Sequence, residues 1–291
     1  MKIFFLIVVC FCSIGLYAQD TTRTPSVVKA ISLMDSRQPL LKEYNGTYLS
    51  SLLYYSYFLK HVQVEGGLVS YNRDSITGKR IGVRIVNLPL MNIIENAYRI
   101  EEIGPFQLNR IVVEKKEIIN DLLPLESMNI DDPLYRKWIV DHTWCYDLRI
   151  PMSQSDNISK IMQQDIERYF RLRGTYEERK VKCLVLTRAG ATDRLKTLDT
   201  ARAPSVEVGE SLLVIKNGSI EDFVQVFKRV NNTYLPPIID ETGYKGRIDL
   251  QLLSPLDDLD KIKTELGKYG LVLQEKERQL KMLVVRETAR L

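Results

Sequence analysis

Residues 237–249 read PIIDETGYKGRID, and this stretch decides how the C-terminal half of the chain is expected to fold. Thr242-Gly243 and Gly246 bracket a tight turn, where a residue without a Cβ atom can take a positive φ angle. Asp240 is expected to cap this turn before Gly243. We therefore assign structural roles to Asp240, Thr242, Gly243 and Gly246, and expect a strand to leave the turn.

A strand, a turn and an amphipathic helix follow one another four times along the chain. The strands are predicted at 83–87, 144–150, 211–215 and 247–252, and the helices that follow them at 88–98, 158–170, 220–230 and 255–269. Apolar residues recur three or four positions apart in each helix. Four such units predict an α+β protein with helices packed on small mixed or antiparallel sheets.

The ends of these elements carry local signals. Ser219 and Ser254 are expected to cap the third and fourth helices, and Gly174 and Gly270 to end the second and fourth. Apolar runs at 271–273 and 282–285 predict a hairpin around the charged residues between them.

Residues 1–18 (MKIFFLIVVCFCSIGLYA) have the features of a secretory signal peptide. Lys2 precedes an apolar run that ends at the small residue Ala18, so cleavage is expected before Gln19. No later stretch approaches the roughly 20 apolar residues of a spanning helix. We expect an exported protein, periplasmic or associated with the cell envelope, without a membrane-spanning segment after cleavage.

The mature chain is expected to form two regions. An N-terminal α+β region covers residues 19–130 and a C-terminal α+β region covers residues 131–291, with a polar loop near 191–208. Lys and Arg total 41 and Asp and Glu total 37, with both signs interleaved. Such near neutrality argues against nucleic acid as a partner, since nucleic acid requires concentrated positive surface.

Cys145 and Cys183 are the two cysteines that remain after signal cleavage. In an oxidising compartment they can form a disulfide, which would stabilise the fold by roughly 3 to 4 kcal/mol. The alternative is two separate buried thiols, because Cys183 lies in a run that is apolar on both faces of a predicted strand.

An aromatic cluster between Tyr44 and Phe58 allows two interpretations. The first is packing on the flanks of a helix whose apolar stripe includes Leu49, Leu52 and Leu59. The second is a surface for a sugar or a peptide, since rings with hydroxyl tips suit both. The tyrosines that would form this surface are Tyr54, Tyr55 and Tyr57.

Three stretches resemble an uncharacterised family of exported bacterial proteins known as the soil-associated domain family. They are residues 87–98, residues 170–186, and residues 237–249 with the later 270–285. Thr175, Lys182 and Leu184 depart from the family pattern in the second stretch. The resemblance implies no established activity. At the level of the fold, the repeated units also resemble the short N-terminal modules of secretins and TonB-dependent receptors.

Catalytic and metal sites find little support in the sequence. Ser26-Val-Val-Lys29, Ser155-Asp156-Asn157 and Lys216-Asn217-Gly218 imitate the three motifs of penicillin-recognising serine hydrolases, but Ser26 lies too near the mature N-terminus for the helical domain of those enzymes. Two histidines are too few for most zinc sites. We expect no catalytic residue, cofactor or metal.

These patterns favour a non-enzymatic envelope protein that presents a surface or an edge strand to another protein or peptide. An alternative is an accessory to periplasmic thiol-disulfide chemistry, because some members of the resembling family lie beside thioredoxin-like domains. A serine hydrolase is the weakest of the three readings.

Overall fold

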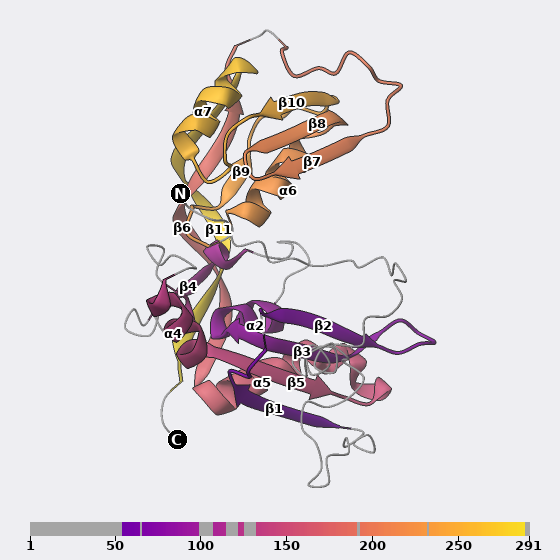
Figure 1. Ribbon diagram of the computed structural model, residues 1–291, viewed down its shortest axis with the longest axis vertical. Helices are drawn as coiled ribbons and strands as arrows, with labels where there is room; N and C mark the ends of the chain where they lie inside the picture. Colours follow the sequence, from indigo (N-terminus) through magenta and orange to yellow (C-terminus); the bar gives the residue numbers. More distant parts are fainter. Residues whose placement is uncertain are drawn as a thin grey trace, which may run out of the picture. The chain divides into compact units, whose positions relative to one another are not determined.

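The computed structural model describes residues 54–64, 66–98, 107–114, 122–124, 132–190, 193–231 and 233–288. Within them the chain forms five α-helices and eleven strands in three small sheets (Figure 1), so the α+β prediction is confirmed. The chain divides into two compact units. Unit 1 comprises Met1–Arg99, Val113–Gly174 and Arg286–Leu291, and unit 2 comprises Ile100–Val112 and Thr175–Val285. The boundary expected at residues 130 and 131 falls within unit 1.

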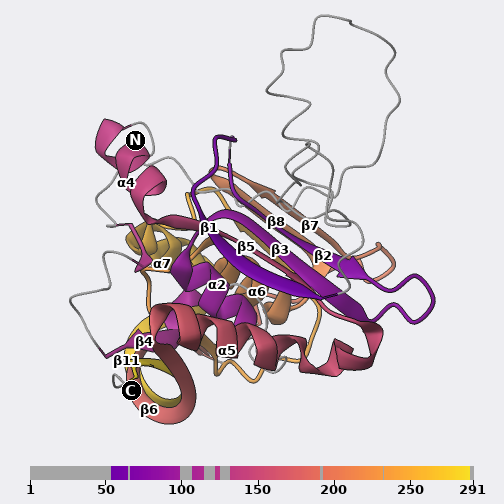
Figure 2. The same ribbon diagram turned by 90° about the horizontal axis from the view of Figure 1, so that it is seen from below.

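Unit 1 is built on one four-stranded antiparallel sheet. Its strands, in spatial order, are β1 (Tyr55–Lys60), β5 (Thr143–Arg149), β3 (Arg80–Pro89) and β2 (Leu68–Arg73). Helices α2 (Leu90–Ala97) and α5 (Ile158–Phe170) pack against each other on one face of the sheet (Figure 2). Helix α4 (Pro133–His142) and the 3₁₀ turn η3 (Met152–Asn157) flank β5 in the chain.

The predicted helix at residues 49–59 is wrong in its described part, where Tyr55–Lys60 form strand β1. Aromatic side chains favour the pleated surface of a sheet, and here they pair across the strands. Phe58 lies opposite Tyr146 of β5, with ring centroids 4.7 Å apart. Tertiary pairing therefore outweighs the helical spacing of the leucines.

Unit 2 contains two sheets, and only a few residues at the ends of their strands belong to unit 1. One is antiparallel, in the order β10 (Ile248–Leu252), β8 (Leu212–Gly218) and β7 (Ser205–Gly209). The other has the order β4 (Ile111–Val113), β11 (Leu271–Glu287), β6 (Leu172–Arg188) and β9 (Ile238–Asp240), with the short helix η1 (Leu108–Arg110) before β4. Strand β7 occupies the last four residues of the predicted loop near 191–208 and one residue beyond it.

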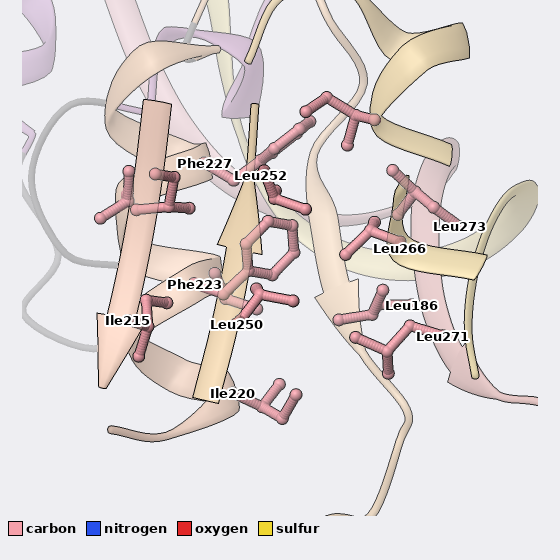
Figure 3. Close-up of a cluster of buried hydrophobic side chains, with 14 of the residues drawn as sticks. Leu186, Ile215, Ile220, Phe223, Phe227, Leu250, Leu252, Leu266, Leu271 and Leu273 are labelled. Atoms are coloured by element: carbon pink, nitrogen blue, oxygen red, sulfur yellow. The ribbon is translucent and has the colours of Figure 1, made fainter. Parts of the chain in front are cut away.

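Helices α6 (Ile220–Val230) and α7 (Leu259–Lys268) enclose the core of unit 2. Phe223, Phe227, Leu250 and Leu266 are almost fully buried in this core, together with residues of β6 and β8 (Figure 3). The predicted cap of α6 is confirmed, because the Ser219 side chain and Asp222 form a reciprocal capping box.

Two predicted element ends are wrong. Helix α5 ends at Phe170, and its C-cap Arg171 takes a left-handed φ of 57°, three residues before Gly174. Helix α7 is capped by Asp258, whose side chain accepts from Lys261 N, and not by Ser254. The Ser254 hydroxyl instead donates to Glu265 at 2.8 Å.

The predicted hairpin near the C-terminus is also wrong, since β11 continues through residues 271–287. Residues 274–281 read QEKERQLK and contain no glycine, proline, asparagine or aspartate to form a tight turn. The charged stretch faces an equally charged part of β6, and Lys180 pairs with Glu277 at 2.7 Å. Cross-strand pairing therefore keeps the segment extended.

The two units share one order of elements. In unit 1, β2, β3, α2, β5 and α5 lead into β6, and in unit 2, β7, β8, α6, β10 and α7 lead into β11. The sequences agree where these runs end, with ERKVKCLVL at 178–186 and ERQLKMLVV at 277–285, identical at five of nine positions. These two runs of the described residues therefore repeat one motif.

Candidate functional site

The segment that follows β9 forms a turn held by its own side chains. Asp240 Oδ1 accepts a hydrogen bond from Thr242 N at 2.8 Å, and Thr242 Oγ1 accepts one from Tyr244 N at 3.1 Å. Gly243 between them has a φ of 62°, a conformation that favours glycine. The turn carries the chain from β9 to the start of β10.

Gly246 has a different reason to be a glycine, because its φ is not positive. A Cβ atom at this position would lie 2.9 Å from atoms of the Tyr244 ring. The ring is itself held in place, since Tyr244 Oη donates to Asp193 Oδ2 at 3.0 Å. Position 246 therefore requires glycine because a side chain there would clash with the Tyr244 ring.

We expect Gly246→Ala to lower the free energy of unfolding by about 1 to 2 kcal/mol, because the new methyl group displaces the Tyr244 ring. Gly267 in α7 is the matched control, since a Cβ atom there meets nothing within 4 Å. Gly267→Ala should raise stability by about 0.5 to 1 kcal/mol. Urea denaturation measures both, and a Gly246→Ala variant as stable as the parent would contradict the steric reading.

The turn forms one wall of a pocket of about 440 Å³ in unit 2. Gly243, Tyr244, Lys245, Gly246 and Arg247 line it from the turn. The facing wall carries Arg188, Asp193, Lys196, Thr197 and Thr200. Four cationic side chains and one carboxylate thus meet around a small concave site.

The single carboxylate of the pocket is held by the protein itself. Asp193 accepts hydrogen bonds from Leu195 N and Lys196 N, both at 3.1 Å, and from the Tyr244 hydroxyl. Burial alone would raise the pKa of Asp193, but these hydrogen bonds and Arg188 hold the pKa below its usual value. Asp193 is therefore an ionised structural group of this wall.

Strand β7 offers a second candidate, a sheet edge with which no other strand of the described residues pairs. It pairs with β8 on one side, and all five of its residues are exposed. Val206 and Val208 lie opposite Ile215 and Leu213, which are fully buried, yet the two valines remain 43% and 41% exposed. The apolar face of the sheet is therefore only partly covered by other residues at this edge.

The family comparison concerns the part of the chain that builds most of unit 2 and, in unit 1, the segment from helix α4 to helix α5. Residues 135–287, more than half of the chain, match the family described as "Protein of unknown function (DUF3738)". The chain belongs to this family. No curated protein and no solved structure matches the chain. The DUF3738 region contains both the pocket and β7. The match confirms the prediction that the chain belongs to an uncharacterised domain family.

Both cysteines lie in the DUF3738 region as free, buried thiols, Cys145 in unit 1 and Cys183 in unit 2. Burial raises the pKa of both thiols above their ordinary values. The Cys145 thiol donates to Asn87 Oδ1 at 3.4 Å, and the Cys183 thiol donates to Val181 O at 3.5 Å. The predicted disulfide stays a prediction.

The tyrosines predicted as a binding surface occupy three different environments. Tyr54 is 52% exposed and Tyr55 is 8% exposed, whereas Tyr57 is half-buried. The Tyr57 hydroxyl donates to Asp147 at 3.0 Å. This carboxylate also pairs with Arg84 inside the sheet.

Sequence reasoning missed the pocket and the Arg84–Asp147 pair. No local signal marks either one, because each joins residues that are far apart in the chain. Ser26, Tyr44 and the signal peptide at 1–18 lie outside the described residues.

Across the described ranges, three or more His, Cys, Asp or Glu side chains do not gather into a group that could hold a metal. His142 ends helix α4 and stacks on Trp138. Among the helices of the described residues, none has the length and apolar character to cross a membrane.

Proposed function

We propose that this chain is an exported, non-catalytic envelope protein that binds an extended peptide segment along the edge of β7. The observation that carries the proposal is the free edge itself, with two half-exposed valines on its core face. An added strand would continue the sheet and cover both valines. Main-chain hydrogen bonds would supply affinity, and alternate apolar side chains of the peptide would supply selectivity.

Strand β7 is short and follows Pro204, but within the strand several features by which sheets avoid unwanted pairing are missing. Residues 205–209 read SVEVG and contain no lysine, no proline and no charged side chain on the core face. Glu207 lies on the opposite face, since side chains alternate along a strand. An edge of this kind is open to a partner strand.

The hairpin geometry indicates which backbone groups point outward. Gly209 and Leu212 close a two-residue loop between β7 and β8. The pair that closes such a loop is hydrogen-bonded, and hydrogen-bonded and non-hydrogen-bonded pairs alternate from there. The N–H groups of Val206 and Val208 should therefore point away from β8, toward an added strand.

We expect Val208→Pro to weaken binding of an extended peptide at least about tenfold, because it removes an outward N–H and a buried apolar contact. Peptides would be selected by display on the mature chain, and their affinity measured by fluorescence anisotropy. Val208→Thr is the matched control, since it keeps the N–H and a β-branched shape and should lose less affinity.

Two results would count against this proposal. One is a selected peptide that binds the Val208→Pro variant as tightly as the parent. The other is a dimer in light scattering that Val208→Pro dissociates, which would show that β7 pairs with a second copy of the chain instead.

The thiol-redox alternative gains no specific support from the geometry. A nucleophilic cysteine needs a thiolate that solvent can reach, whereas both thiols here are buried with raised pKa values. We therefore keep the peptide-binding proposal alone.

We also infer that the DUF3738 family and the soil-associated family are one group of exported proteins. Two of the three stretches that carry the resemblance, residues 170–186 and residues 237–249 with 270–285, lie within the matched residues 135–287. The fold-level likeness to secretin and TonB modules stays a prediction.

A further inference from the structure

The pocket beside the family turn carries more positive charge than the fold requires. Arg188, Lys196, Lys245 and Arg247 line it. Within the described residues none of these four side chains forms an ion pair, whereas Arg179 and Arg278, elsewhere in unit 2, each pair with a glutamate. Arg188 lies over the Tyr244 ring at 5.0 Å, and Arg247 Nη1 donates to Asn217 O at 3.5 Å. The chain is near neutral as a whole, so this cluster is a local excess of charge.

A second observation points to a ligand in the same place. Thr197 lines the pocket and is 3% exposed, and its hydroxyl oxygen is buried without a hydrogen-bond partner. A buried hydroxyl is nearly always satisfied, because leaving it unpaired is costly. The Thr197 hydroxyl can donate to an acceptor that enters the pocket.

We propose that this pocket binds a small oxyanionic ligand that carries at least two negative charges on phosphate or carboxylate groups. Its volume of about 440 Å³ suits a small molecule. The two guanidinium groups can bind oxygen pairs in a bidentate manner, and the two lysines add compact charge. Gly243 leaves the backbone of the turn open to close approach, since a Cβ atom there would meet nothing within 4 Å.

The carboxylate of Asp193 does not block such a ligand. Its two oxygens already accept hydrogen bonds from Leu195 N, Lys196 N and Tyr244 Oη. The side chains that line the pocket still sum to a net charge of +3, from four cations and one anion. Attraction therefore dominates at the mouth of the site.

This site is separate from the β7 edge in its chemistry and in its test. Val208→Pro should leave oxyanion binding unchanged, whereas pocket variants should leave binding of the apolar peptide unchanged. The two proposals can therefore fail independently.

Calorimetric titration of the mature chain with pyrophosphate and with citrate, at constant ionic strength set by NaCl, tests the proposal. Saturable binding of both anions supports a general oxyanion site. Binding of one alone supports the site and assigns it to phosphate or to carboxylate ligands. No binding of either anion would overturn the proposal.

Thr197→Val is the decisive variant, because it keeps the shape of the side chain and removes the unpaired hydroxyl. We expect it to weaken anion binding about tenfold, and to leave the urea midpoint of the ligand-free chain unchanged or raised. A lower midpoint with unchanged anion binding would show that the hydroxyl serves the fold, and would contradict the proposal.

Charge variants provide the matched comparison. Lys245→Ala should weaken anion binding by up to about fivefold, as expected for an exposed charge pair. Lys268→Ala removes an equally exposed lysine of α7 outside the pocket and should leave the affinity unchanged. Equal losses in both variants would indicate nonspecific attraction and would overturn the site.

Discussion

Replacing Asp147 by leucine should lower the free energy of unfolding by about 3 to 5 kcal/mol, which is among the largest losses expected for a single substitution here. The substitution leaves Arg84 as a buried charge without its carboxylate. Arg84 Nη2 and Asp147 Oδ2 lie 2.8 Å apart, and their side chains are 1% and 2% exposed. Arg84→Met should be destabilising for the same reason.

The sheet register explains why this pair is closely coupled. Asp147 of β5 lies between Tyr57 of β1 and Arg84 of β3, so all three side chains emerge on the same face. Arg84 Nε and the Tyr57 hydroxyl also donate to Asp147 Oδ2, at 3.2 and 3.0 Å. One carboxylate oxygen thus receives three donors.

The double variant Arg84→Met/Asp147→Leu supplies the control. Because it removes both charges, it should be less destabilised than either single variant, with an interaction energy of about 1 to 3 kcal/mol in a double-mutant cycle. Urea denaturation, followed by hydrogen exchange at β5 amides, measures the change. Additive losses would show that the pair does not act as a unit.

Leu266→Ala should cost about 2 to 5 kcal/mol, because Leu266 of α7 is fully buried in the core of unit 2 (Figure 3). Leu198 allows the same chemical change on the surface, since it is 97% exposed. Leu198→Ala should stay within about 0.5 kcal/mol of the parent. Similar losses in the two variants would contradict the assignment of the core.

The sequence predicts those elements whose signals are local. Strand β8, the Ser219 cap and helix α6 follow each other as expected, because a capping residue and a regular apolar stripe act within a few positions. The strand and helix at β5 and α5 are predicted for the same reason. These segments needed no knowledge of their partners.

Predictions fail where a distant partner decides the structure. Strand β1 depends on pairing with β5, and the unbroken β11 depends on β6. The pocket requires residues near 193 to meet residues near 245, which no spacing rule links. The repeat of ERKVKCLVL and ERQLKMLVV, by contrast, is visible in the sequence and would have revealed that the two units share one motif.

Amide hydrogen exchange of Val206 and Val208, with and without a display-selected peptide, shows whether the edge of β7 receives a partner strand. Both amides should exchange rapidly in the free chain and become protected in the complex. A peptide that binds the chain tightly while these two amides keep their exchange rates would contradict the proposal.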